Sequence, residues 1–274
     1  MLDPPRTFDE LCQDVAWPLS RLYHQHSKLS GHNLLEFQER IATFSQDAEA
    51  VRESSRAYKR YPTRPSITLP RAKRRLGGHR LFDILRSRRT RRGTFSRKAI
   101  TPKQWGGLLE SACGVTGHVT HPDFPDVTQD LRAWPSGGAM YPIETYLCVL
   151  QDGELERGLY HYQVESHALA HLGPCPEDEQ LHRLVYADGL WENAGGLIVL
   201  TAVFDRTQTK YGERGYRFVF LDAGHLAQNI LLVCEDLRLA AIPLGGFDDD
   251  GLAAAMDVEP LTELPIYAIL IGTE

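Results

Sequence analysis

The chain lacks paired cysteines. Its five cysteines are scattered, odd in number and without a CxxC pair: Cys12, Cys113, Cys148, Cys175 and Cys234. Disulfide frameworks and cysteine-ligated zinc sites both need cysteines at defined spacings, and the spacing of His161, His167 and His171 suits no strand face, with no acid or cysteine to complete a site. We therefore expect no disulfide-stapled fold, no metal site and a reducing, cytoplasmic location.

Long hydrophobic runs and nucleotide-binding signatures are also missing. No apolar stretch approaches the roughly 18 residues that a membrane helix requires, and residues 1–15 are acidic, without a basic-then-apolar signal pattern. Neither GxGxxG after a strand nor GxxxxGK[ST] occurs. The sequence thus favours no membrane partner, no Rossmann site and no P-loop. Its 42% hydrophobic and 24% charged residues are typical of a globular protein.

Acidic residues are nearly absent between Arg56 and Lys103. This block holds 17 Lys and Arg against the single Asp83, a net +16, which leaves −22 for the rest of a chain whose net charge is −6. Such a block can bind nucleic acid, an acidic peptide or a phosphate-bearing cofactor, or fold back onto the acidic body of its own dimer. Aromatic residues for base stacking are few there, Tyr58 and Tyr61, so we expect no nucleic-acid partner.

What is present is a mixture of helix and strand patterns. Helical periodicity occupies residues 1–55, followed by a proline-rich, basic linker over 61–76. Further helices are predicted over 79–89, 102–114, 177–186, 216–239 and 249–256, with Thr101 and Asp248 as N-caps of the second and the last. Strands are predicted over 143–150, 158–164, 197–204 and 266–272. These elements predict an α+β sandwich with a largely antiparallel sheet under helices.

One segment combines proton-active residues with an apolar helix. The run 210–229 reads KYGERGYRFVFLDAGHLAQN, in which Lys210 and Tyr211 precede Arg214 and Arg217. Burial and proximity can shift the pKa values of such side chains, and an ammonium on Lys210 would favour the ionised form of Tyr211. Adjacent helical residues do not face each other, so we expect the pair on a loop or at a helix start, or with divided roles.

Three other segments carry glycines or clustered arginines that can contact a ligand closely. Residues 134–144, WPSGGAMYPIE, contain glycines that let backbone approach a flat ring closely. Residues 88–95, RRTRRGTF, offer guanidinium forks for phosphate beside the hydroxyl of Thr90. Residues 243–249, PLGGFDD, place two glycines before a helix.

These segments together resemble the SagB-type azoline dehydrogenases, the flavin oxidases of the nitroreductase superfamily. KYGERGYR is the most specific element, WPSGGAMYPIE is similar to the family's PSGGARYPIE loop with Met140 in place of arginine, and RRTRRGTF resembles RRSxRxF with Thr90 in place of serine. Tyr23-His24 with Lys28 resembles the family's YHxxTK string more loosely.

The resemblance implies a homodimeric, nitroreductase-like sandwich that binds FMN. We expect a helical extension and basic linker over 1–78 and the FMN-binding domain over 79–274. It implies Lys210 and Tyr211 as catalytic residues. The cofactor-binding residues implied are Arg88, Arg89, Thr90, Arg92, Pro135, Ser136, Gly137, Gly138, Gly245, Gly246 and Arg217. The apolar helix 216–239, with Gly224, Gln228 and Asn229, is the predicted dimer core.

The function implied is oxidation of thiazoline or oxazoline rings on a ribosomally made peptide to thiazole or oxazole, with O2 reoxidising the flavin. A cyclodehydratase or synthetase complex is a further expected partner. Three alternatives stay open: an NAD(P)H-dependent nitro or quinone reductase, a dehydroamino-acid reductase acting on a modified peptide, and a nucleic-acid-binding adaptor built on residues 56–103.

Overall fold

A seven-stranded antiparallel sheet forms the centre of the molecule. The computed structural model describes residues 19–71, 81–93, 95–187, 190–191 and 193–274. Its strands lie in the order β1-β6-β5-β4-β7-β9-β8. Their bounds are β1 Ser66–Thr68, β4 Ile143–Val149, β5 Gly158–Gln163, β6 Ala168–Gly173, β7 Gly196–Ala202, β8 Leu239–Leu244 and β9 Leu264–Thr273. The four predicted strands are β4, β5, β7 and β9, and every pair is antiparallel, so the predicted fold class is confirmed.

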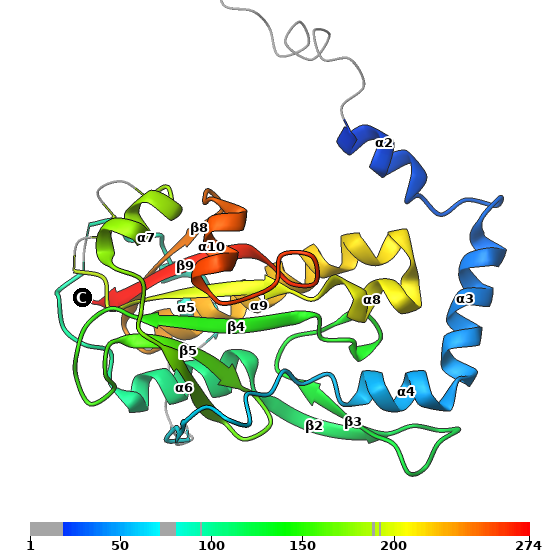
Figure 1. Cartoon of the computed structure of the whole chain (residues 1–274), viewed down its shortest axis with the longest axis horizontal. Coiled ribbons are helices and arrows are strands. Elements are labelled where there is room, and N and C mark those ends of the chain that lie inside the picture. The colour runs from blue at the N-terminus through cyan, green and yellow to red at the C-terminus, as the bar shows by residue number, and fades with distance from the viewer. Residues whose placement is uncertain (1–18, 72–80, 94, 188–189, 192) are drawn as a thin grey trace, which may run out of the picture.

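Helices cover both faces of this sheet (Figure 1). On one face, α6 (Pro102–Cys113) and α9 (Glu213–Asp236) pack on alternate strand residues such as Leu147 and Ile198. On the other, α7 (Asp178–Leu184) and α10 (Asp249–Ala255) pack on the intervening residues, such as Cys148 and Leu197. The central strands are therefore mostly apolar because each has both faces buried, with Glu144 of β4 and Thr201 of β7 among the buried polar exceptions.

The predicted caps of two helices are present. The Thr101 side chain accepts a hydrogen bond from the backbone N–H of Gln104, which completes a capping box with Pro102 in the first turn of α6. The Asp248 side chain accepts from Gly251 N and begins α10. The predicted helix over 177–186 is α7, and the predicted helix over 79–89 is α5 (Leu81–Ser87); residues 72–80 lie outside the described part of the chain.

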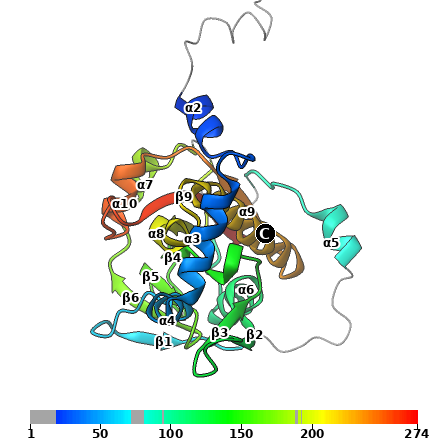
Figure 2. The same ribbon diagram turned by 90° about the vertical axis from the view of Figure 1, so that its right-hand side faces the viewer.

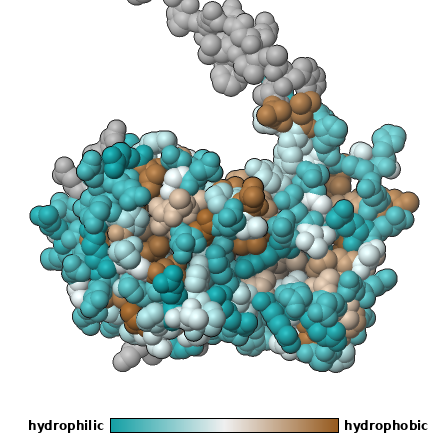
Figure 3. Space-filling view, in the orientation of Figure 1, coloured by the Kyte–Doolittle hydropathy of each residue, from teal (hydrophilic) through white to brown (hydrophobic). Residues whose placement is uncertain are grey.

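An N-terminal arm of three helices stands beside the sandwich (Figures 1 and 2). It comprises α2 (Leu19–His26), α3 (Leu34–Gln46) and α4 (Ala48–Ser55), which confirms the helical expectation for the described residues up to 55. Figure 3 shows a mainly hydrophilic surface on which apolar residues gather at α2, where Leu19 and Leu22 are exposed. The arm precedes the linker, in which β1 pairs with β6, a strand that the proline-rich sequence did not predict.

The basic block folds back onto acidic residues of its own chain. Lys59 pairs with Glu263, Arg60 with Glu165, and Arg71 with Glu110, at N–O distances of 2.5, 2.8 and 2.7 Å. Electrostatic complementation within one chain thus accounts for these side chains, and the case for a nucleic-acid surface weakens accordingly.

Helix α9 is long and apolar enough, by length and composition alone, to cross a membrane. It begins three residues before the predicted start at 216. Its inner residues, including Val219, Leu226 and Ile230, are buried against the sheet and α6. That packing is the arrangement of a core helix in a globular protein.

Candidate active site

The register of the sheet brings two distant segments together. Strands β4 and β7 pair antiparallel with Ile143 opposite Ala202. The loop that precedes β4 therefore lies beside the element that follows β7, which is α8 (Phe204–Tyr211). Lys210 and Tyr211 form the last two residues of α8, and Gly212, at φ +55°, separates α8 from α9. The pair thus stands at a helix end, not at the predicted loop or helix start.

The glycine loop and this pair are in direct contact. Gly138 has φ +63°, and a Cβ built on it would overlap the Tyr211 hydroxyl and lie 3.1 Å from Lys210 Nζ. A Cβ on Gly137 would lie 3.5 Å from the Phe218 ring of α9. At position 138 only a glycine can adopt this positive φ and also let the Tyr211 hydroxyl approach the backbone so closely. The structure therefore unites the predicted catalytic pair with the predicted ring-edge loop.

Burial shifts the two proton-active groups in opposite directions. It raises the pKa of Tyr211, with a further rise from the nearby carboxylate of Asp222, and it lowers the pKa of Lys210. The expectation that Lys210 promotes ionisation of Tyr211 is therefore wrong: loss of water disfavours the phenolate and the ammonium alike. Relative to the same side chains in water, the environment thus favours the uncharged form of each group.

Asp222 is a residue of the candidate site that the sequence analysis did not select. Its buried carboxylate accepts a hydrogen bond from Ser136 Oγ at 2.5 Å, and Ser136 Oγ in turn accepts from the backbone N–H of Tyr141 at 2.9 Å. Burial raises the pKa of Asp222 to about 6, against the lowering effect of the Ser136 and Gly137 hydrogen bonds. An acid inside the apolar run FVFLDAG was the available signal.

Arg217, predicted to bind the cofactor, lies against the N-terminal arm. Its Nε and Nη2 donate to Ser27 Oγ at 2.9 and 2.7 Å, and Nη2 also donates to the carbonyl of His24 at 2.6 Å. Arg214 Nη1 donates to the Ser27 carbonyl at 3.0 Å. The Tyr23-to-Lys28 string is thus joined to the KYGERGYR segment, and the Arg217 guanidinium faces Ser27.

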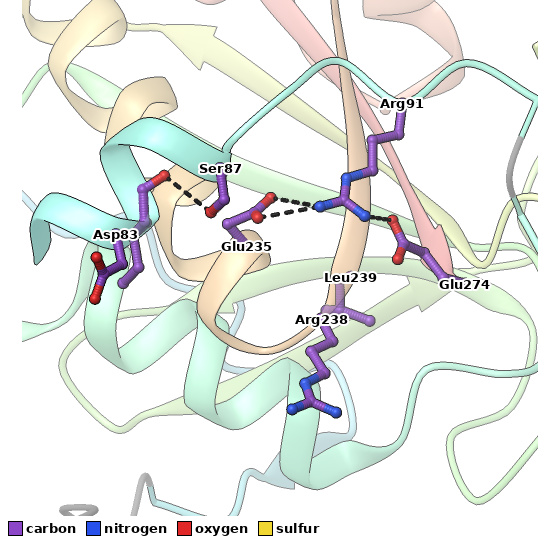
Figure 4. A pocket seen from close by; sticks show the side chains of 8 residues that line it. Asp83, Ser87, Arg91, Glu235, Arg238, Leu239 and Glu274 are labelled. Atoms are coloured by element: carbon purple, nitrogen blue, oxygen red, sulfur yellow. Dashed lines mark hydrogen bonds and ion pairs between the residues drawn. The ribbon is translucent and has the colours of Figure 1, made fainter. Parts of the chain in front are cut away.

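The arginine element 88–92 lies at the opposite end of the sheet. Ser96 N donates to the carbonyl of Thr273 at the end of β9, and Arg91 pairs with Glu235 at 3.1 Å and Glu274 at 2.5 Å. Figure 4 shows the side chains of Arg91, Glu235 and Glu274 converging at a cavity of about 370 Å³, which Ser87 and Arg238 also line. Arg88 is half-buried, whereas Arg89, Thr90 and Arg92 are exposed.

Within one chain this element is far from the glycine loop. Phe218, beside the loop, and Glu235, beside Arg91, are 17 residues apart on α9. At 1.5 Å per residue this separation is about 26 Å. Gly245 and Gly246 occupy a third place, at the end of edge strand β8, where Gly246 O accepts from Tyr186 N at 3.0 Å. One chain therefore does not bring all the predicted cofactor residues together.

Comparison with known proteins identifies the family. The nitroreductase family profile matches residues 85–273, most of the chain. The chain belongs to the nitroreductase family. It is 29% identical over 192 residues to MJ1384, a nitroreductase-like protein of Methanocaldococcus jannaschii, a match that covers 68% of this chain and 90% of the relative.

Two further relatives of this nitroreductase-family chain are named as processing proteins of microcin B17 and trifolitoxin. The microcin B17-processing protein McbC of Escherichia coli is 31% identical over 155 residues, covering 54% of this chain and 56% of McbC. The trifolitoxin-processing protein TfxB of Rhizobium leguminosarum is 28% identical over 147 residues, covering 51% of this chain and 39% of TfxB. The resemblance seen in the sequence is confirmed by this set of relatives.

Solved structures share the fold. A nitroreductase-like protein of Anabaena variabilis superposes with a TM-score of 0.69 at 26% identity, covering 92% of this chain and 46% of the other. One chain of the E. coli microcin synthetase McbBCD complex, solved with truncated pro-MccB17 bound, superposes with a TM-score of 0.59 at 22% identity, covering 90% and 98%. The chain therefore has the nitroreductase fold.

Proposed function

We propose that this protein is an FMN-dependent dehydrogenase that oxidises thiazoline or oxazoline rings on a ribosomally made peptide to thiazole or oxazole. The observation that carries the proposal is the contact of Lys210 and Tyr211 with the bare backbone of Gly138. Two relatives that process peptides, McbC and TfxB, support the substrate class.

The residues present fit a flavin. Next to Pro135 and Ser136, Gly137 and Gly138 present backbone that lacks a Cβ to a ring edge, and the arginines of residues 88–92 offer guanidinium forks to a phosphate. When bound, FMN supplies an acceptor for two electrons in the form of hydride, and O2 would reoxidise it. Ser136, fixed by Asp222, holds the loop in place for this contact.

Lys210 and Tyr211 divide the proton chemistry. Converting an azoline to an azole removes two electrons and two protons, one of the protons from the acidic Cα. Lys210, whose pKa is lowered by burial, is the proposed base that takes this proton from its deprotonated form, and the raised pKa of Tyr211 keeps its hydroxyl as a hydrogen-bond donor that orients the substrate. Desolvation of both groups at one place supports this assignment.

A second copy of the chain would complete each flavin site. One extended flavin mononucleotide is shorter than the about 26 Å that separates the loop from the arginine element on α9. The outer face of α9 exposes apolar side chains, namely Tyr216, Phe220 and Leu221, around Gly224, His225 and Gln228. Asn229, predicted for the interface, instead donates to Ala133 O within its own chain at 3.1 Å. We propose a homodimer through this outer face.

Wider partners and the domain division are also proposals. The McbBCD structure contains a peptide-bound synthetase complex, which supports a synthetase partner here. A division at residue 78 and a cytoplasmic location stay predictions.

The test is oxidation of a cyclised peptide by the purified, FMN-loaded protein. The expected result is a yellow preparation, and a loss of two hydrogens per ring by peptide mass without added nicotinamide. A preparation that stays colourless after incubation with excess FMN overturns the cofactor. Reduction of bound FMN by NADPH without peptide, with no change in peptide mass, favours a nitro or quinone reductase. With NAD(P)H added as the two-electron donor, a gain of two hydrogens on a dehydroamino-acid peptide favours the dehydroamino-acid reductase.

A further inference from the structure

Helix α3 of the N-terminal arm lies along α8, directly over the proposed catalytic pair. Phe37, Ile41 and Phe44 recur at helical spacing and are half-buried, while their neighbours on α3 are mostly exposed. Arg40 Nη1 donates to the carbonyl of Thr209 at 3.3 Å. Figure 2 shows α3 in front of α8, in agreement with the contacts between the two helices.

Two aromatic rings of α3 meet the two proton-active side chains. The Phe37 ring stacks on the Tyr211 ring, with centroids 6.1 Å apart and an interplanar angle of 28°. The Phe44 ring centroid lies 5.2 Å from Lys210 Nζ. On its other side Tyr211 meets the Phe218 ring edge-on at 5.1 Å. α9, the glycine loop and α3 therefore border the pair, which is half-buried between them.

The arm is fastened to the motif at a second place. Ser27 receives the Arg217 guanidinium, the Tyr23 hydroxyl donates to the carbonyl of Glu213 at 2.8 Å, and the Tyr23 ring lies edge-on to Tyr216 at 5.0 Å. This arm precedes the residues that match the nitroreductase family, which begin at 85. Its contribution to the site therefore comes from contacts in this structure and not from the family match.

We propose that α3, through Phe37 and Phe44, is a wall of the reaction site that keeps water from Tyr211 and Lys210 and contacts the heterocycle of the substrate. The contact with a heterocycle rests on the proposed function; the exclusion of water does not. A flat five-membered ring held against Lys210 would lie beside the Phe44 ring, and aromatic faces suit such a contact. Phe44 is then a specificity-determining residue and Phe37 a positioning residue for Tyr211.

The charged groups around Lys210 agree with a role for water exclusion. Arg40 of α3 and Arg214 of α9 are cations bonded to backbone carbonyls, and Asp222 of α9 bonds Ser136. Within the described residues, no carboxylate forms an ion pair with Lys210. The Phe44 ring centroid lies 5.2 Å from Lys210 Nζ, and burial lowers the pKa of Lys210.

The first experiment measures the Lys210 amine directly in the FMN-loaded protein. Lys210 is labelled competitively with acetic anhydride across a pH series, and its peptide is quantified by mass spectrometry. Phe44→Ala admits water, so we expect the midpoint of Lys210 labelling to move to higher pH. Leu35→Ala, the same kind of truncation on the exposed side of α3, should leave it unchanged. Phe44→Leu keeps an apolar cover and should stay close to the wild type, even if Phe44→Ala loosens the arm.

The second experiment measures turnover of the cyclised peptide. Phe44→Ala should retain its flavin spectrum, raise KM about tenfold and shift the pH profile of kcat upward, whereas Leu35→Ala should change neither. An unchanged labelling midpoint and unchanged KM in Phe44→Ala overturn the proposal. Absence of azole formation by the wild type would overturn the proposed function alone, because the labelling midpoint still reports whether α3 excludes water.

Discussion

The side chains that lie near the two ends of helix α9 are in different electrostatic environments. At the N-terminal end, Lys210 and Tyr211 are desolvated and no described carboxylate pairs with Lys210. At the C-terminal end, Arg91 is held between Glu235 and Glu274. Desolvation without a counter-charge prepares a group for proton transfer, whereas a paired arginine is neutralised and positioned. One helix thus separates the proposed chemistry from the proposed phosphate contact.

The sharpest way to test the N-terminal end is to remove the pair. Lys210→Ala and Tyr211→Phe should each keep the flavin spectrum and lower azole formation by about 10²–10⁴, the usual cost of losing a positioned proton-transfer group. Turnover is read by peptide mass, and Ser136→Ala, which releases the loop from Asp222, should instead loosen FMN first. Full turnover by both variants would show that the pair has no part in the reaction. Loss of flavin in both variants would show that Lys210 and Tyr211 bind the cofactor instead.

The outer face of α9 decides whether its two ends cooperate across a dimer. Leu221→Glu places a charge among the exposed apolar residues of that face, and we expect it to weaken dimerisation about 100-fold or more, because burying an unpaired charge is costly. Sedimentation measures the mass of the assembly in solution. We expect the amount of bound FMN to fall as the dimer dissociates. Leu261→Glu, at a residue 93% exposed elsewhere, is the control. A wild-type monomer with FMN fully bound would contradict the shared site.

The proposed phosphate contact near the C-terminal end of α9 is tested by comparing a flavin that has a phosphate with one that lacks it. Arg88→Ala should raise the Kd for FMN about 10–100-fold, as expected for the loss of a charged hydrogen bond of about 1.5–3 kcal/mol. Binding of riboflavin, which has no phosphate, should change little. Arg86→Ala, on the exposed surface of α5, is the matched control in fluorescence titrations. Equal losses for FMN and riboflavin would remove Arg88 from the phosphate contact.

Local patterns predicted the sheet and its covering helices well. Runs such as residues 197–204 and 266–272 are apolar on both faces, which only a covered central strand explains. The Thr101 and Asp248 caps were readable because their side-chain bonds are local. Strands β1, β6 and β8 of this sheet and the two-stranded sheet of β2 (Val115–Thr120) and β3 (Thr128–Arg132) were missed. In β1 three exposed residues between prolines carry no alternation, and its partner β6 is about 100 residues away.

The site was predictable in its residues but not in its assembly. Helix α8 has a polar sequence, FDRTQTKY, and its position depends on packing against α3 and α9. The sequence therefore did not show that Lys210 and Tyr211 end a helix, nor that Phe44 of the arm lies over them. The pKa directions also depend on this packing, because desolvation is a property of the folded environment.

The smallest expected effect concerns Asp222, which joins the glycine loop to α9. Its pKa of about 6 lies above the value of 3.8 for an unperturbed side chain, so the ionised form costs folding free energy. This cost is absent well below pH 4, develops between pH 4 and 6 and is complete above pH 6. The side chain of Asp222→Asn cannot ionise, so this variant avoids the cost. The difference in Tm, variant minus wild type, should therefore be larger at pH 7 than at pH 4 by about 2–5 °C.

Thermal unfolding of the flavin-free proteins across that pH range measures this difference. Asp236→Asn, near the C-terminal end of α9 and remote from the glycine loop, serves as the control. The Asp222→Asn difference should be constant above pH 6.5, where the wild-type carboxylate is fully ionised. A difference that stays flat from pH 4 to 7 would mean that Asp222 titrates as an ordinary carboxylate, and that its hydrogen bond to Ser136 is held without cost.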